Sequence, residues 1–379
     1  MLVVGLMSGT SLDGMDAAIL RCKSTAEAEV GTALSGLSIA FEKYEREILS
    51  RAVDDALRWQ FSGPEPSSFE PAATMLAQVA VKAVTTVLQK NRVKGRDLHA
   101  IGFHGQTLLH VPPVGKSIGK TLQIGNAQIL ADTFDCKVVH DFRSADMKAG
   151  GHGAPLAPAW HFELAKKTER LPFVFVNIGG VSNITFVPTV SGTGAHEKMV
   201  AFDCGPGNGP LDALMQFHNL GQMDTDGALA AKGNVQQAVV SQALSHLPAV
   251  GAAMSVDRWA FDHTIVEGLS VVDGAATLVE ITAQAIVRGL SSLSAQPKQI
   301  LVGGGGRLNP VLMHRLRELS AVDVMTCERA GFNGDLIEAE AFAWLTALRL
   351  AEQPTSWPGT TGATRPVVGG IICEPSGLF

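Results

Sequence analysis

Small and hydroxylated residues fill the turn between the first two strand-like runs of the chain. The segment VVGLMSGTSLDGMDAAIL places Ser8, Gly9, Thr10, Ser11 and Asp13 between an apolar run and a more alternating one. Successive backbone N–H groups in a tight turn form a concavity that binds anions. Glycine lets a phosphate approach the backbone closely. Taken alone, these residue types suit a phosphate-binding turn, and an ordinary hairpin turn is the alternative.

Two further glycine turns favour a nucleotide. PFVFVNIGGVSNITFVP repeats the order of apolar strand, glycine turn and strand, and QILVGGGGRLNP adds a third turn at 303–306. No GxxxxGK[ST] occurs, which argues against a P-loop, and GGGGRL does not complete the dinucleotide motif GxGxxG. The remaining arrangement is a nucleotide held between two domains by hairpin turns, as in actin, Hsp70 and hexokinase. Asp13 would then face the metal side of the phosphates through water, because Mg²⁺ keeps much of its hydration shell.

Asp203 is the candidate general base. It follows the strand-like run Met199 to Phe202 and precedes a Gly-Pro-Gly turn, and a helix is expected from Pro210, a residue type favoured at the first helical position. A carboxylate at the end of a strand can take a proton from water. A turn carboxylate that caps local N–H groups is the alternative, and the residue types leave both open.

Other polar residues suit a sugar site. Arg143 and Asp146 lie in DFRSAD; arginine binds carboxylates in a bidentate manner, although Asp146 could equally orient Arg143 within one loop. His104 and Gln106 of GFHGQT follow a strand and could bond sugar hydroxyls, with a structural histidine as the alternative.

Two carboxylates lie close together in GDLIEAEAFAW. Glu338 has apolar neighbours and is expected to point into the site, whereas Glu340 is expected to be solvated. The alternative for Glu338 is a charge in the first helical turn, which the helix dipole favours.

These residues need an α/β framework, because strand-like runs alternate with helical ones along the chain. The opening strands are predicted at Leu2 to Met7, Met15 to Arg21 and Leu37 to Tyr44, with a later amphipathic helix around Leu278 to Leu293. The Gly/Pro-rich AGGHGAPLAPAW marks a crossing. We therefore expect domain I at 1–155 plus 350–379 and domain II at 156–349.

Composition narrows the class of protein. The 379 residues, 46% of them hydrophobic, can bury two cores. The net charge of -6 and the absence of a Lys/Arg run argue against nucleic acid. No basic leader and no apolar run of roughly 20 residues are apparent, so no membrane partner is expected. Five cysteines without a CxxC suggest reduced thiols in a cytoplasmic protein. Small molecules are the expected partners, and a homodimer stays open.

Nine motifs in one order give a specific resemblance. The chain resembles the 1,6-anhydro-N-acetylmuramic acid kinase family through GLMSGTSLDGMD, GFHGQT, LQIGNA, DFRSADMKAGGHGAPLAP, NIGGVSNIT, FDCGPGN, GGGGRLNP, GFNGDLIEAEAFA and TTGATRPVVGG. The resemblance implies a two-domain actin/Hsp70/hexokinase-like (ribonuclease H-like) α/β fold with a central nucleotide cleft. It also implies a kinase of peptidoglycan recycling that uses ATP, Mg²⁺ and water. Such an enzyme opens the 1,6-anhydro ring and phosphorylates O6, giving N-acetylmuramic acid 6-phosphate and ADP.

The resemblance also implies roles for single residues. Asp203 would be the catalytic base, and Asp13 would be on the metal side. By their residue types, and not through the resemblance, the expected sugar-binding residues are His104, Gln106, Arg143, Asp146 and Glu338. The nucleotide would contact Gly9, Thr10, Ser11, Leu12, Asp13, Gly14, Met15, Asp16, Gly179, Gly180, Gly303, Gly304 and Gly305.

One block departs from the family pattern. Where many members have a stretch like PPKSTGRE before a Phe, this chain has AAMSVDRWAF, with Met254 in place of the lysine and Trp259 in place of the acid. Contacts from this block are therefore not carried over. A kinase of the same fold acting on another amino sugar remains the main alternative. An Hsp70-type binding module is the remote one, because VVGGIICEPSGLF leaves no room for a peptide-binding domain.

Overall fold

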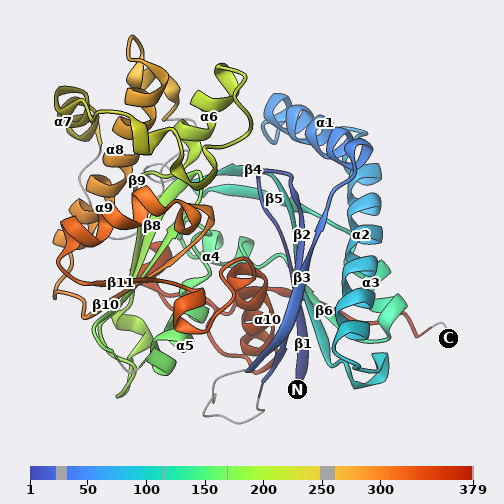
Figure 1. Ribbon diagram of the computed structural model, residues 1–379. Coiled ribbons are helices and arrows are strands. Elements are labelled where there is room, and N and C mark those ends of the chain that lie inside the picture. Colours follow the sequence, from blue (N-terminus) through green and yellow to red (C-terminus); the bar gives the residue numbers. More distant parts are fainter. Residues whose placement is uncertain (23–31, 114, 116, 169, 248–260, 378–379) are drawn as a thin grey trace. The chain divides into compact units, whose positions relative to one another are not determined.

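The chain divides into two compact units. The computed structural model describes residues 1–22, 32–113, 115, 117–168, 170–247 and 261–377 (Figure 1). Unit 1 comprises Met1–Glu163 and Leu336–Phe379, and unit 2 comprises Leu164–Asp335. This differs from the expected division, which gave 336–349 to domain II. The physical reason is that α10 (Ile337–Leu350) packs on strands of the unit 1 sheet.

Unit 1 is built on a seven-stranded sheet of order β12-β6-β4-β1-β2-β3, with β5 paired to β4. The bounds are β1 (Leu2–Ser8), β2 (Gly14–Arg21), β3 (Thr32–Ala40), β4 (Ala100–Val111), β5 (Lys120–Ile124), β6 (Lys137–His140) and β12 (Ile371–Cys373). β1, β2 and β3 run antiparallel in turn, whereas β4 lies parallel to β1 and β6 parallel to β4.

The third predicted strand was wrong in its bounds. The sequence suggested Leu37 to Tyr44, but β3 ends at Ala40 and α1 (Lys43–Trp59) begins three residues later. The Glu45 carboxylate accepts a hydrogen bond from the Glu42 N–H at 2.8 Å, which fixes this helix start.

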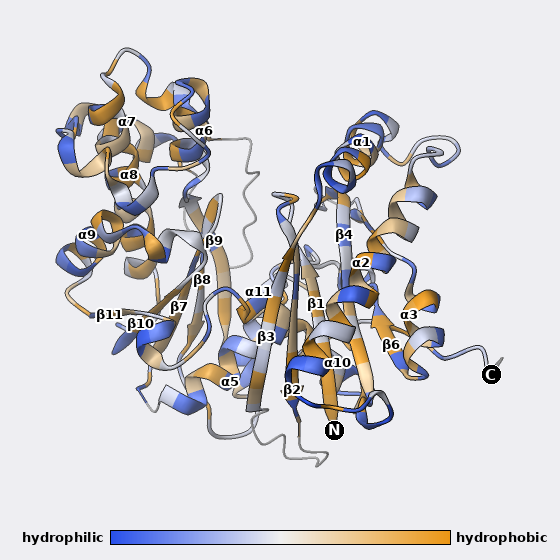
Figure 2. Cartoon of the chain, turned by 45° about the vertical axis from the view of Figure 1, so that its right-hand side comes forward, coloured by the Kyte–Doolittle hydropathy of each residue, from blue (hydrophilic) through white to orange (hydrophobic). Residues whose placement is uncertain are grey.

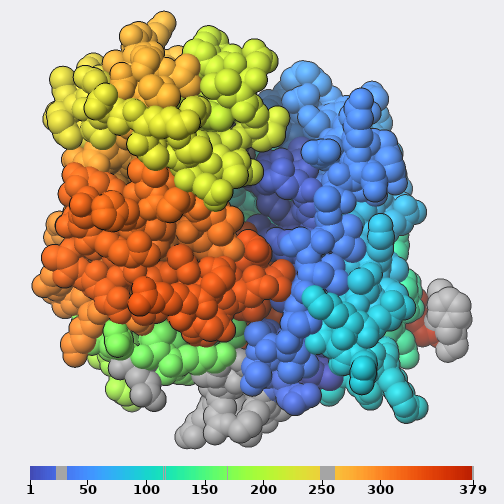
Figure 3. Space-filling model, in the orientation of Figure 1, coloured from blue at the N-terminus to red at the C-terminus, as the bar shows by residue number. Residues whose placement is uncertain are grey.

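Helices cover both faces of the unit 1 sheet. α1, α2 (Phe69–Lys90) and α3 (Ala127–Phe134) lie on one side and α10 on the other (Figure 2). In the space-filling view, the blue and cyan atoms of α1 and α2 form the right-hand side of unit 1 (Figure 3). Glycines bring α10 close: a Cβ at Gly5 would lie 2.0 Å from the Ala339 carbonyl oxygen, and one at Gly102 would lie 2.4 Å from the Phe342 carbonyl oxygen.

Among the described residues, α2 is the one helix that is long and apolar enough to cross a membrane, with 22 residues. This result rests on length and mean composition alone: Glu70, Gln78 and Lys82 interrupt the apolar sequence of α2, so the helix is not the run of roughly 20 apolar residues that the sequence lacks. Its apolar character has a local cause, since Leu76, Val84 and Val87 of α2 are fully buried in the core against the sheet.

Unit 2 repeats the same design. Its five-stranded sheet has the order β11-β10-β7-β8-β9, with β7 (Phe173–Ile178), β8 (Val181–Val187), β9 (Val200–Pro206), β10 (Gln299–Gly303) and β11 (Asp323–Thr326). β7, β8 and β9 are antiparallel in turn, and β10 and β11 continue in parallel. The order β11-β10-β7-β8-β9 corresponds to β6-β4-β1-β2-β3 of unit 1, which has β12 and β5 in addition. This correspondence confirms the internal repeat, and the two sheets with their helices confirm the expected α/β fold class.

The remaining helices are α4 (Ser144–Lys148), α5 (Pro158–Thr168), α6 (Gly209–Phe217), α7 (Gln237–His246), α8 (Val271–Ser291), α9 (Pro310–Ser320) and α11 (Pro358–Thr361). The helices expected near Pro210 and around Leu278 are confirmed as α6 and α8.

Candidate active site

A buried glutamine from β4 holds the first glycine turn, between β1 and β2. Ser8 Oγ donates to Gln106 Oε1 at 2.5 Å, and Gln106 Nε2 donates to the Gly9 carbonyl at 3.1 Å. Leu12 takes a left-handed conformation (φ 58°), and its N–H donates to the same Gly9 carbonyl at 3.3 Å. Both ends of the Gln106 amide thus have partners in the turn, so this side chain fixes the turn rather than facing outward.

The side chains of this turn divide by exposure. Thr10, Ser11 and Asp13 are exposed at its tip, whereas Met15 is fully buried in the core. Met15 can therefore offer a ligand only its backbone. Asp16 on β2 accepts a hydrogen bond from Ser38 Oγ of β3 at 2.5 Å.

The second glycine turn is joined to the start of α6. The Gly179 carbonyl accepts a hydrogen bond from the Asn208 N–H at 2.7 Å, and the Gly180 carbonyl accepts from the N–H groups of Gly207 at 3.0 Å and Gly209 at 3.2 Å. These backbone bonds keep the β7–β8 turn against the N-terminal end of α6.

Asp203 lies within β9 and not after it. The strand continues to Pro206 because Asp203 pairs with Asn183, and Gly205 with Ser182, across β8. The register shifts between these pairs, so Cys204 is the extra residue of a β-bulge, a device that redirects neighbouring side chains. Asp203 itself is half-buried. Burial raises the pKa of the Cys204 thiol, which donates to the Ser182 carbonyl at 3.2 Å.

The third glycine turn lies against the end of β7. Gly303 pairs with Asn177. Gly304 has a φ of 72°, and a Cβ there would lie 2.5 Å from the Ile178 carbonyl oxygen; a Cβ at Gly306 would lie 2.3 Å from Ile178 Cγ2. Unit 2 thus gathers the β7–β8 turn, the end of β9 and the GGGG turn at one edge of its sheet.

The packing does not require every glycine in these turns. A Cβ at Gly9 would find its nearest neighbour, Ser11 Oγ, at 3.6 Å, and at Gly180 it would meet nothing within 4 Å. At Gly305 the nearest atom would be Asn208 Nδ2 at 3.4 Å. The packing therefore leaves room for a Cβ at these three positions. A ligand that lies against the backbone gives a reason for glycine there.

Arg143 and His104 form a buried pair in unit 1. Arg143 approaches His104 Nε2 with Nη2 at 3.0 Å and Nε at 3.3 Å, and donates through Nη1 to the Gly153 carbonyl at 2.8 Å. His104 Nδ1 lies 2.7 Å from the Gly105 carbonyl, so this nitrogen carries the proton. Desolvation, with Arg143 adding to it, lowers the pKa of His104 to about 3. The imidazole is therefore neutral and accepts from Arg143.

Glu338 belongs to the same neighbourhood. Its side chain is accessible, yet the protein atoms around it desolvate the carboxylate and raise its pKa. The Asp16 charge adds to this rise and the Arg143 charge opposes it. Glu340 was wrongly expected to be solvated: it is 5% exposed and accepts a hydrogen bond from Trp160 Nε1 at 3.1 Å.

Comparison with known proteins identifies the family. The sequence profile described as anhydro-N-acetylmuramic acid kinase matches residues 1–375. The anhydro-N-acetylmuramic acid kinase of Phenylobacterium zucineum is 41% identical over 381 residues, covering 99% of this chain and 100% of the relative. That of Acidiphilium cryptum is 42% identical over 377 residues, covering 98% of each. The chain belongs to the anhydro-N-acetylmuramic acid kinase family. It is an ATP-dependent sugar kinase.

Asp146, expected at the sugar in this family member, has protein partners at both carboxylate oxygens. Oδ2 accepts from the Gly153 N–H at 2.8 Å, and Oδ1 accepts from Thr361 Oγ1 at 2.6 Å and from Ser356 Oγ. Since Arg143 binds the Gly153 carbonyl, Asp146 and Arg143 hold the two sides of one peptide segment. This favours the positioning role that the sequence left open. Ser356 and Thr361 were not singled out from the sequence, although TTGATRPVVGG was one of the family motifs.

Within the part of the chain that the structure describes, no group of three or more His, Cys, Asp or Glu residues could hold a metal ion. Asp13 is exposed. The altered block 254–261 lies outside the described residues except for Phe261.

Proposed function

We propose that this member of the family uses ATP and water to open the 1,6-anhydro ring of 1,6-anhydro-N-acetylmuramic acid and to phosphorylate O6. The products are N-acetylmuramic acid 6-phosphate and ADP. Family membership over residues 1–375 supports the reaction. The observation that carries the ATP site is that the packing leaves room for a Cβ at Gly9, Gly180 and Gly305, one position in each of the three glycine turns.

The first two turns would bind the phosphates. The Gly9–Asp16 segment offers backbone N–H groups and the exposed hydroxyls of Thr10 and Ser11, which are the donors that a polyphosphate takes. Gly179 and Gly180 would supply the second phosphate turn, and Gly303, Gly304 and Gly305 the adenosine side. Asp13 would face Mg²⁺ through water, since this ion prefers oxygen ligands and releases its waters reluctantly. When bound, Mg²⁺ would neutralise charge on the phosphates.

Asp203 would act as the general base. Its half-buried carboxylate next to the β9 bulge accepts a proton from water, and the resulting hydroxide attacks the anomeric carbon. The bond from that carbon to O6 breaks, and its electron pair stays on O6. O6 then attacks the γ-phosphorus of ATP and ADP leaves. General-base help of this kind contributes roughly 10²–10⁴-fold in rate.

Arg143 and Glu338 would orient the sugar. Arg143 has N–H groups beyond those directed at His104 and Gly153, and they suit the lactyl carboxylate of the substrate. Glu338, accessible and with a raised pKa, suits a sugar hydroxyl or amide. His104, Gln106 and Asp146 would support these contacts through the bonds described above.

A substrate panel tests the proposed reaction. The protein is incubated with Mg-ATP and either 1,6-anhydro-N-acetylmuramic acid or other amino sugars, and ADP and sugar products are quantified by mass spectrometry. We expect ADP matched by a product heavier by one water and one phosphoryl group (HPO3), with the anhydro sugar preferred. A faster reaction with another amino sugar would favour the alternative kinase of the same fold.

A further inference from the structure

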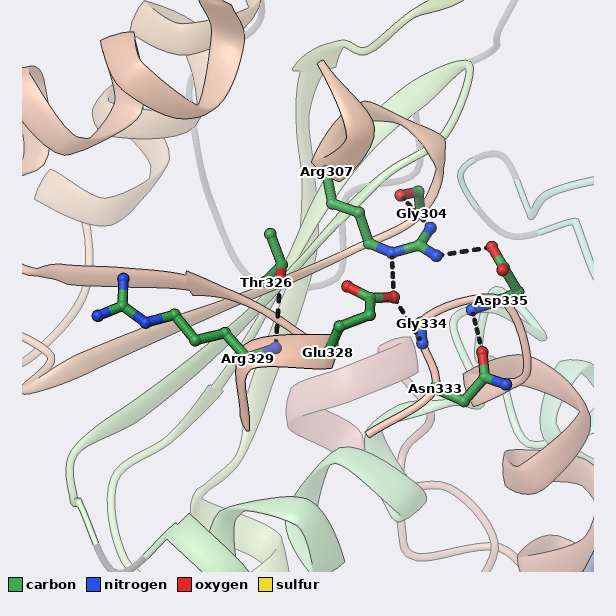
Figure 4. Close-up of polar contacts among 8 residues, drawn as sticks. All are labelled: Gly304, Arg307, Thr326, Glu328, Arg329, Asn333, Gly334 and Asp335. Atoms are coloured by element: carbon green, nitrogen blue, oxygen red, sulfur yellow. Dashed lines mark hydrogen bonds and ion pairs between the residues drawn. The ribbon is translucent and has the colours of Figure 1, made fainter. Parts of the chain in front are cut away.

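Arg307 is buried directly beside the third glycine turn. It lies in the short 3₁₀ turn Gly305–Leu308, and its side chain is 3% exposed. Its three guanidinium nitrogens each have a different partner (Figure 4): Nη1 donates to the Gly304 carbonyl at 2.9 Å, Nε to Glu328 Oε1 at 2.8 Å and Nη2 to Asp335 Oδ1 at 2.7 Å. The glycine turn and the segment 328–335 are thus joined through one cation.

The segment 328–335 is shaped around this guanidinium. A Cβ at Gly334 would lie 2.2 Å from Arg307 Nε, so the backbone passes directly against the side chain. The Gly334 N–H donates to Glu328 Oε1 at 3.2 Å. Figure 4 shows the Asp335 N–H bonded to Asn333 Oδ1, at 3.1 Å, next to this contact. Side chain and backbone therefore fit one another, and the position of Arg307 is fixed.

The charges are arranged asymmetrically. The side chains of Glu328 and Asp335 are 48% and 66% exposed, whereas the cation that they share is buried. Desolvation lowers the pKa of Arg307, but the bonds from Asp335 and Glu328 outweigh it and the pKa is raised. Removing one partner of a buried ion strongly lowers the stability of a protein, whereas an exposed ion pair adds little to it. This arrangement favours a structural role for Arg307, in which its buried guanidinium fixes the backbone that it contacts.

The buried end touches the glycine turn. The Gly304 carbonyl accepts from Arg307, while the Cα side of Gly304 faces the Ile178 carbonyl and Asn177 Oδ1. Gly304 is therefore confined from two directions, and Gly305, where a Cβ would make only an ordinary contact with Asn208 Nδ2 at 3.4 Å, follows immediately.

We propose that Arg307 is a positioning residue for ATP that sets the location of the Gly303–Gly305 backbone against the adenosine. The inference rests on the proposed assignment of this turn to the adenosine side of the nucleotide. Arg307 acts through Gly304 and does not touch the phosphates. Its loss then weakens the binding of ATP, which has an adenosine, and leaves the binding of inorganic triphosphate unchanged.

The test compares Arg307→Met and Arg307→Lys with Arg315→Met. Arg315 is a matched control, because it also pairs with two carboxylates in unit 2, Glu280 at 2.6 Å and Glu318 at 2.9 Å, but joins α8 and α9. Each variant is assayed for KM of ATP and of the anhydro sugar, for inhibition by inorganic triphosphate, and for thermal unfolding.

We expect Arg307→Met to raise the KM of ATP roughly tenfold, equivalent to about 1.4 kcal/mol. The KM of the sugar and the inhibition constant of inorganic triphosphate stay within about twofold of wild type. Arg307→Lys keeps the charge but loses the forked geometry of the guanidinium, so its KM of ATP should lie between those of wild type and Arg307→Met. Arg315→Met lowers the unfolding temperature and leaves both KM values as in wild type.

An unchanged KM of ATP in a folded Arg307→Met protein overturns the inference, and so does an equal weakening of ATP and inorganic triphosphate. Should Arg307→Met not fold, Glu328→Gln and Asp335→Asn each remove one charge from the cluster and must show the same ATP-selective change. Gly305→Val tests separately whether this glycine turn binds the adenosine. An unchanged KM of ATP in that variant contradicts the assignment of the turn, whatever the result for Arg307.

Discussion

At the scale of single residues, glycines in the three turns fall into two classes. Gly304 and Gly306 are required by packing, because a Cβ would lie within 2.5 Å of Ile178 atoms. Gly9, Gly180 and Gly305 have room for one. The first class serves the fold, and we assign the second to the nucleotide. Substitutions in the two classes should therefore separate stability from binding.

Gly9→Val tests this separation. The packing leaves room for a Cβ at this position, but the added side chain would occupy the volume assigned to a phosphate. We expect a loss of ATP affinity of tenfold or more, roughly 1.4 kcal/mol, with an unfolding temperature close to wild type. Calorimetric titration with ATP and a thermal melt measure the two quantities. Wild-type ATP affinity in the folded variant would count against the phosphate turn.

His104 predicts a pH dependence of stability. Its pKa is about 3 in the folded protein against 6.5 ordinarily, so the unfolded chain binds more protons between these values. Above about pH 6.5, His104 is neutral in both states and does not change the free energy of unfolding. As the pH drops from 6.5 toward 3, this group lowers the free energy of unfolding by about 1.4 kcal/mol per pH unit. Denaturant unfolding from pH 7 to 4 should show a smaller decline in His104→Gln. Equal declines in both proteins would contradict the neutral buried imidazole.

At the scale of elements, α10 is placed by glycines in the sheet. Because a Cβ at Gly102 would lie 2.4 Å from the Phe342 carbonyl oxygen, Gly102→Val must push the helix away or distort β4. We expect a loss of about 3 kcal/mol or more of stability, at the upper end of overpacking effects. Chemical denaturation measures it, and Gly180→Val is the control that should leave stability within about 0.5 kcal/mol. Equal stability of both variants would refute this packing.

The sequence predicts elements whose apolar pattern is local. β1, β2, β7, β8, α6, α8 and α10 were expected from alternation, helical spacing and Pro210. β3 and β9 were misjudged at their ends, because pairing with a neighbouring strand decides how far a strand extends. Asp203 is in β9 only because β8 continues opposite it. No single-sequence pattern shows that partner.

The same limit applies to the side chains of the site. The glycine turns, Arg143 and Glu338 stand out by residue type and motif. The support from Ser8, Ser356 and Thr361 depends on contacts between residues far apart in the chain, such as Thr361 with Asp146. Arg307 was seen in the sequence only as a residue that breaks a dinucleotide motif, and its partners Glu328 and Asp335 lie 21 and 28 residues away.

At the scale of the whole molecule, the two units share one arrangement of strands and differ in the candidate functional residues that they carry. Both units have three antiparallel strands followed by parallel ones, with a glycine turn after the first strand. Unit 1 adds the Arg143–His104 pair and Glu338, whereas unit 2 adds Asp203 and the GGGG turn. The proposed sugar contacts therefore lie mainly in the first repeat, and the proposed catalytic base lies in the second.

The central claim is that Asp203 activates the water that opens the anhydro ring. The most direct measurement is product formation from Mg-ATP and 1,6-anhydro-N-acetylmuramic acid by wild type and Asp203→Asn, with ADP and the sugar product quantified together. We predict equal amounts of ADP and N-acetylmuramic acid 6-phosphate from wild type, and a rate lowered by roughly 10²-fold or more in a folded Asp203→Asn protein that still binds ATP. The phosphorylated sugar forming at the wild-type rate in that variant would contradict the claim.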